Sequence, residues 1–102
     1  MNLLAVALQT SGRESRVVMS ADGPIKGCES FFIGTPPRFV IDLAGMWVNQ
    51  GPSELKLESD KVKGVRVGEH HDRLRIVIDL KGGKPISPTI EESSKEITLI
   101  LR

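Results

Sequence analysis

Two stretches decide the fold class: PRFVIDL at residues 37–43 and DRLRIVIDL at residues 72–80. In both stretches apolar residues recur at every second position, and this period of two is typical of half-buried β-strands. Phe39, Ile41 and Leu43 should therefore share the inward face of one strand, because alternate side chains of a strand point to opposite faces. The leucines and isoleucines at positions 74, 76, 78 and 80 should face inward in the other.

The same alternation continues through most of the chain and predicts an all-β fold. Between the predicted strands lie turn-forming residues such as Ser11-Gly12, Asp22-Gly23-Pro24, Gly34-Thr35-Pro36-Pro37, His70-His71-Asp72, Gly82-Gly83-Lys84-Pro85 and Ser93-Ser94. Residues 44–61 are the least regular stretch; residues 54–58 alternate and could add a ninth strand, and residues 55–62 could hold one helical turn. The eight predicted strands are Leu3–Gln9, Ser15–Ala21, Lys26–Ile33, Arg38–Leu43, Val62–Glu69, Arg73–Leu80, Ile86–Glu91 and Glu96–Leu101.

The two halves of the chain resemble each other in sequence. A shift of 59 residues places RVVM at 16–19 on RIVI at 75–78, and a shift of 58 places residues 39–41 on residues 97–99. Each half is then a unit of four strands, which cannot bury both faces of a sheet alone. We therefore predict a sandwich of two stacked or interleaved four-stranded sheets, built from an internal repeat.

Length and composition exclude several classes of protein. With 102 residues the chain is expected to be one domain, and its net charge of +1 argues against nucleic acid or anionic membrane as the partner. The longest apolar run, residues 3–8, is far too short to span a membrane or to form a signal peptide, so we expect Met1 to begin a domain excised from a longer protein. A single cysteine excludes an internal disulfide.

The outward faces of the two opening stretches carry the pattern Arg-x-x-x-Asp twice, as Arg38 with Asp42 and Arg75 with Asp79. In an extended strand these partners are about 13–14 Å apart, but the Arg of one strand could meet the Asp of an antiparallel neighbour. One interpretation is a salt-bridge ladder that keeps the face soluble. The other is a polar platform that binds sugars and carboxylates through Arg donors and Asp acceptors.

These residues resemble the AMIN domain of bacterial cell-envelope proteins. The resemblance covers essentially the whole chain, except that residues 46–61 show none of the family pattern. That pattern is Pro-Arg-apolar-Val-apolar-Asp-Leu, then apolar-Arg-apolar-Gly, then a second Arg-apolar-Val-apolar-Asp-Leu strand. The matching positions are Pro37, Arg38, Val40, Asp42 and Leu43, then Arg66 and Gly68, then Arg75, Val77, Asp79 and Leu80.

The resemblance implies a β-sandwich of two four-stranded sheets and a non-catalytic module without a cofactor. Such domains accompany N-acetylmuramoyl-L-alanine amidases and type IV pilus secretins, where they are associated with peptidoglycan binding and with positioning the parent protein in the periplasm, often at the division site. The residues that it implies for peptidoglycan binding are Arg38, Asp42, Arg75 and Asp79, to which Arg66 and Arg73 could add. The alternative is an assembly module that pairs an exposed strand edge with an envelope protein.

Other candidate sites are weaker. His70-His71-Asp72 is interpreted as a polar turn and not as a metal site, because consecutive turn residues rarely converge on one ion. The sequence contains no nucleophile motif and no suitably placed pair of carboxylates, so it does not predict an enzyme. Cys28 is expected to be a half-buried inert thiol. Trp47 could stack on a sugar, but plugging the end of the core is the favoured interpretation.

Overall fold

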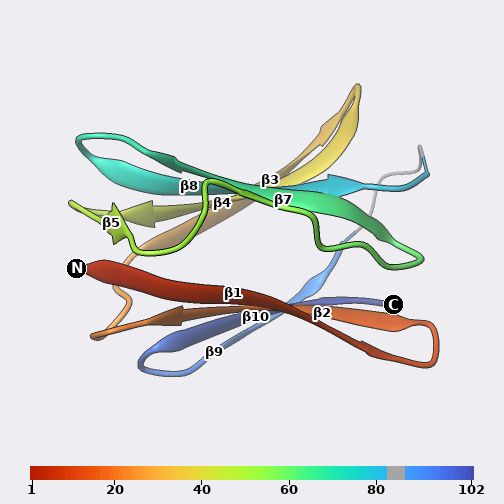
Figure 1. Cartoon of the computed structure of the whole chain (residues 1–102), viewed down its shortest axis with the longest axis horizontal. Coiled ribbons are helices and arrows are strands. Elements are labelled where there is room, and N and C mark those ends of the chain that lie inside the picture. Colours follow the sequence, from red (N-terminus) through yellow and green to blue (C-terminus); the bar gives the residue numbers. More distant parts are fainter. Residues whose placement is uncertain (83–86) are drawn as a thin grey trace.

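The computed structural model describes residues 1–82 and 87–102, and within these ranges ten strands form two five-stranded sheets. The two sheets lie one above the other as the layers of a sandwich (Figure 1). The all-β prediction is confirmed. The strands are β1 (Asn2–Ser11), β2 (Glu14–Ala21), β3 (Cys28–Gly34), β4 (Pro37–Ala44), β5 (Val48–Asn49), β6 (Glu54–Leu55), β7 (Val62–Glu69), β8 (Arg73–Leu80), β9 (Thr89–Glu92) and β10 (Glu96–Leu101).

The prediction of two four-stranded sheets is wrong in strand number. One sheet has the order β5-β1-β2-β10-β9 and the other has the order β3-β4-β8-β7-β6. The fifth strand of each is a two-residue strand from the irregular 44–61 connection: β5 pairs with the start of β1, and β6 pairs with β7. Two residues are too few to show a period in the sequence. The short strand expected at residues 54–58 is present as β6, and its span is only Glu54–Leu55.

The sheets are interleaved along the chain. The first half contributes the β1–β2 hairpin to one sheet and the β3–β4 hairpin to the other, and the second half contributes β7–β8 and β9–β10 in the opposite order. The four longer strands of each sheet therefore come from both halves of the chain, as expected for interleaved sheets. The internal repeat itself stays a prediction.

Local sequence explains where most strands begin and end. β1 and β2 are joined by a two-residue turn in which Gly12 has φ of 61°, a conformation that only glycine adopts easily at the first position of such a turn. The strand expected from Lys26 begins at Cys28, after Gly27 with φ of 75°. The strand expected over residues 86–91 is described as Thr89–Glu92, and Ile86 and the turn residues 83–85 lie outside the described residues.

The core lies between the two sheets and consists of the inward side chains of both. In β8 buried and half-buried residues alternate without exception, and Leu74, Ile76 and Ile78 have no exposed surface. Trp47 belongs to this core, with 6% of its surface exposed, and its Nε1 donates a hydrogen bond of 3.0 Å to the carbonyl of Ala44. The interpretation of Trp47 as a core residue is therefore confirmed.

Replacing Ile76 by alanine should lower the free energy of unfolding by about 2–5 kcal/mol, because the side chain is fully buried and its loss leaves a cavity. The midpoint of urea unfolding measures the change. The matched control is Val48→Ala on β5, where 51% of the side chain is exposed and the expected change is within about 0.5 kcal/mol. Equal losses in the two variants would contradict this assignment of the core.

Candidate functional site

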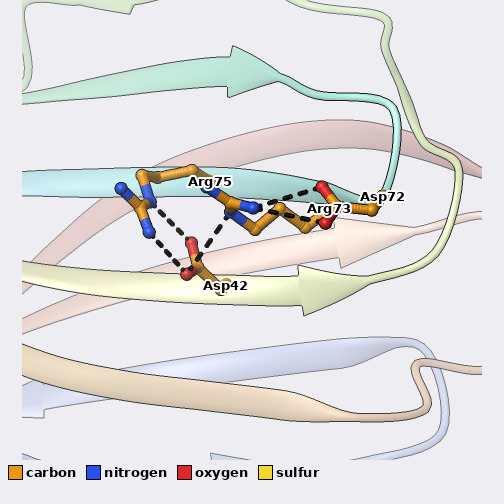
Figure 2. Close-up of polar contacts among 4 residues, drawn as sticks. All are labelled: Asp42, Asp72, Arg73 and Arg75. Atoms are coloured by element: carbon orange, nitrogen blue, oxygen red, sulfur yellow. Dashed lines mark hydrogen bonds and ion pairs between the residues drawn. The ribbon is translucent and has the colours of Figure 1, made fainter.

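The central strands of the β3-β4-β8-β7-β6 sheet place Asp42 beside Arg75. β4 and β8 are antiparallel, and their register sets these two residues directly opposite each other. Arg75 donates from Nε and Nη2 to the two carboxylate oxygens of Asp42, at 2.8 Å each (Figure 2). Only 12% of the Asp42 side chain is exposed. The sequence-based expectation that the Arg of one strand meets the Asp of its neighbour is confirmed for this pair.

Arg73 extends the same cluster toward the β7–β8 turn. Its Nη1 donates to Asp72 Oδ1 at 3.2 Å, and its Nε lies 3.7 Å from Asp42 Oδ2 (Figure 2). That Nε is buried and has no hydrogen-bond partner among the described residues. Asp42 therefore faces two guanidinium groups, one in a close bidentate pair and one at ion-pair distance.

Arg66 and Asp79 form a second bidentate pair on the same face. Arg66 donates from Nε and Nη2 to the two oxygens of Asp79, at 2.9 Å each. The residue directly opposite Asp79 on β7 is Gly64, which has no side chain, so Arg66 reaches Asp79 from two positions farther along β7. The residue opposite Asp79 on the other side is Arg38, but within residues 1–82 and 87–102 no ion pair to Arg38 is present. The symmetric Arg38–Asp79 pair that the repeated pattern suggested is therefore not formed.

The hydrogen bonds of the two ion pairs shift pKa values on this face. The hydrogen bonds from Arg75 hold the pKa of Asp42 below its ordinary value, with further help from the charges of Arg75 and Arg73 and against the effect of burial. The hydrogen bonds to Asp42 and to Asp79 raise the pKa values of Arg75 and Arg66, respectively. Each of these two guanidinium groups therefore lies at hydrogen-bond distance from a carboxylate.

An apolar strip separates the two pairs. Phe31 of β3, Val40 of β4 and Val77 of β8 lie side by side across the sheet, in register, on the same outer face. Val40 has only 1% of its surface exposed, whereas Phe31 has 39%, and the Arg75 guanidinium lies 5.5 Å from the centre of the Phe31 ring. Because side chains alternate along a strand, Phe31 and Phe32 of β3 lie on opposite faces of the sheet. The alternation with Glu29, which faces outward, would have identified Phe31 as the exposed ring.

We call this outer surface the Arg–Asp face, and it contains all six residues that the sequence analysis selected. Arg75, Asp42 and Arg73 form one cluster, Arg66 and Asp79 form the other, and Arg38 lies beside the second. Two shallow grooves border the Arg75–Asp42 pair. One, of about 260 Å³, passes over Gly68 between Arg66 and Arg75, and the other, of about 500 Å³, is lined by Asp42, Asp72, Arg73 and neighbouring residues.

Cys28 and the potential metal-binding side chains were the other candidates from the sequence, and the structure does not favour a reactive role for them. Cys28 is half-buried, as expected, and burial, together with the neighbouring Glu92 and Asp42 carboxylates, raises its thiol pKa to about 11. A thiol with so high a pKa is almost entirely protonated at neutral pH and is a poor nucleophile. In the described part of the chain, no three His, Cys, Asp or Glu side chains converge on a position that could hold a metal ion.

Comparison with known families identifies the family of the chain. The model of the family described as AMIN domain matches residues 5–100. This is a family of non-catalytic modules that bind peptidoglycan and target their parent proteins, and its members occur in periplasmic and other envelope proteins. No curated protein matches the chain. Among the residues that the structure describes, there is no helix with the length and apolar character needed to cross a membrane.

Asp42→Ala should lower the free energy of unfolding by about 1–3 kcal/mol, because it leaves two guanidinium groups without their carboxylate in a partly buried setting. Arg38→Ala should change it by less than about 0.5 kcal/mol, because no ion pair is lost. Urea unfolding at neutral pH measures both values. A loss in Arg38→Ala as large as that in Asp42→Ala would contradict the assignment of Arg38 as the arginine outside the ion pairs.

Acid should remove the stabilisation that Asp42 provides. Its pKa in the folded state lies below the unfolded value of about 3.9, so the ionised carboxylate stabilises the fold above that pH, and the stabilisation disappears as the pH falls through the folded pKa. Asp42→Asn should therefore be less stable than the wild type at neutral pH and should lose less stability between about pH 5 and pH 2. Urea unfolding across this pH range tests the prediction. An equal loss of unfolding free energy in the wild type and in Asp42→Asn would refute it.

Proposed function

On the premise that the chain belongs to the AMIN domain family, we propose that this domain binds peptidoglycan through its Arg–Asp face. By binding there it positions a longer parent protein in the bacterial periplasm. The observation that carries the proposal is that all six residues selected from sequence lie on one outer face of one sheet. The family supplies the class of ligand, and the geometry of the face supplies the candidate site.

The two ion pairs leave much of their hydrogen-bonding capacity unused. A guanidinium has five N–H donors, and Arg75 and Arg66 each use two of them on an aspartate, so five minus two leaves three on each. Each carboxylate also retains acceptor positions beyond the two that its arginine occupies. Donors and acceptors therefore lie next to each other in fixed positions, which suits the hydroxyl and amide groups of peptidoglycan.

The affinity of one copy for the wall should be weak. The face is an open sheet surface with shallow grooves, and such a surface buries little of any one repeating unit of the polymer. Repeated contacts along the polymer would compensate, since each further contact is made at high effective concentration. A weak and repeated contact suits a module that positions a protein on the wall without immobilising it.

Co-sedimentation with purified peptidoglycan sacculi tests the proposal. The wild type should pellet, and Arg38→Ala should reduce the pelleted fraction several-fold without loss of stability, because Arg38 has no ion pair to lose. Arg13→Ala, in the exposed β1–β2 turn on the other sheet, is the matched control and should pellet like the wild type. A wild type that stays in the supernatant, or an Arg38→Ala variant that pellets as well as the control, would refute binding at this face.

An assembly function is the second candidate, and one feature of the fold favours it. β1 pairs with β2 over most of its length, but on its other side β5 covers only Asn2 and Leu3, so within the described ranges Leu4–Ser11 form an open edge. An open edge can take up a strand from another protein. Ala7→Lys on that edge should then abolish association with an envelope partner, whereas Arg38→Ala should leave it unchanged.

A further inference from the structure

The two bidentate pairs of the Arg–Asp face have no net charge to offer an ionic ligand, and Arg38 is the arginine of this face that lies outside the ion pairs of the described residues. Arg75 is neutralised by Asp42 and Arg66 by Asp79, each through two hydrogen bonds of 2.8–2.9 Å. A carboxylate that approached either guanidinium would also meet the aspartate that holds it, because the two charges of each pair lie side by side. The stem peptides of peptidoglycan, which carry free carboxylates, are therefore poorly matched to the two pairs.

An uncharged ligand with many hydroxyl groups meets no such repulsion. A sugar hydroxyl both donates and accepts, and each Arg–Asp pair presents free N–H donors next to carboxylate oxygens that still have acceptor positions. Because each pair is locked in a bidentate geometry, these donors and acceptors have a fixed direction before the ligand arrives. Fixed groups lose less conformational entropy on binding than mobile arginines would.

The apolar strip lies in the row between the Arg75–Asp42 pair and Asp79, and Arg66 continues the same row on β7. Val40 and Val77 separate the Arg75–Asp42 row from the row of Asp79, and Phe31 closes the strip at the edge strand β3. Phe31 is 39% exposed, and the Arg75 guanidinium, held by Asp42, lies 5.5 Å from the centre of its ring. A pyranose ring has an apolar C–H surface with hydroxyl and amide groups around it, and a strip bordered by donors and acceptors is complementary to that shape.

From this arrangement we infer that the Arg–Asp face binds the glycan strand of peptidoglycan and not its stem peptides, with Phe31 as the residue against which a sugar ring packs. The inference rests on the proposed function and names the part of the polymer that is recognised. Phe31, Val40 and Val77 contact the C–H surface of the ring, while the Arg75–Asp42 and Arg66–Asp79 pairs bind its hydroxyl and amide groups. Since an uncharged sugar meets ion pairs that have no net charge and an apolar strip, we expect binding to depend only weakly on salt.

The probes are an uncharged oligomer of β-1,4-linked N-acetylglucosamine and the free stem peptide. In an NMR titration of the wild type, the sugar oligomer should shift the amide signals of β3, β4 and β8, and the stem peptide should leave them in place. In sacculus pelleting, the sugar oligomer should compete and the stem peptide should not, and the pelleted fraction should change less than about twofold from low to high salt. Shifts or competition from the stem peptide alone, or release of the protein by salt, would overturn the inference.

Variants of Phe31 test the role of the ring. Phe31→Ala should weaken binding of the sugar oligomer about fivefold to tenfold, the effect of losing part of one buried apolar side chain. Phe31→Trp keeps an aromatic surface and should retain binding, which separates loss of the ring from loss of folding. Leu4→Ala, an exposed apolar residue of similar accessibility on β1, is the matched control and should bind like the wild type. Equal binding by Phe31→Ala and the wild type would refute the role of Phe31.

The failure of this inference is distinguishable from the failure of wall binding. A wild type that does not pellet with sacculi and does not respond to the sugar oligomer refutes both. A wild type that pellets, but is displaced by the stem peptide and not by the sugar oligomer, keeps the proposed function and refutes recognition of the glycan.

Discussion

The antiparallel pairing of β4 with β8 is the constraint on which the rest of the structure depends. Its register places Ile41 opposite Ile76 in the core and Asp42 opposite Arg75 on the outer face. Because side chains alternate along a strand, a slip of one residue would expose the isoleucines and bury the charges. The packing of the core and the assembly of the Arg–Asp face are therefore two consequences of one register, and neither can be altered without the other.

The two sequence-based interpretations of the Arg–Asp pattern, a structural ladder and a binding platform, are compatible. A salt bridge near the surface contributes less than about 1 kcal/mol to stability, so the half-exposed Arg66–Asp79 pair adds little to a sandwich whose core includes fully buried isoleucines and leucines. The bidentate contacts instead fix the orientation of each guanidinium. Some of its N–H donors are not used by the aspartate. A structural ion pair that fixes its own donors is a suitable element for a binding surface.

The sequence predicted strand positions well and side-chain partners only in part. Alternation located β7, β8 and β10 at their observed bounds, because a period of two over six or more residues is a strong signal. It missed β5, which is too short to show a period. The repeated pattern indicated that Asp79 could meet Arg38 on an antiparallel neighbour. The two residues do lie opposite each other, but Asp79 binds Arg66 across the position of Gly64, which has no side chain. Whether two residues pair depends on all their neighbours across the sheet, and no single strand contains that information.

The predicted repeat also bears on which face of the sandwich binds the ligand. Under its two shifts, Arg75 corresponds to Arg16, and Asp42 corresponds to Ile100. In the structure Arg16 and Ile100 lie opposite each other in the second sheet, as Arg75 and Asp42 do in the first. Ile100 is 2% exposed and offers no carboxylate, and Arg16 instead binds Glu14 on its own strand at 2.7 Å and lies 3.8 Å from Glu91 of β9. Among the described residues the two sheets thus share a register at this position, but the bidentate cross-strand Arg–Asp pair is formed in the β3-β4-β8-β7-β6 sheet and is absent from the other.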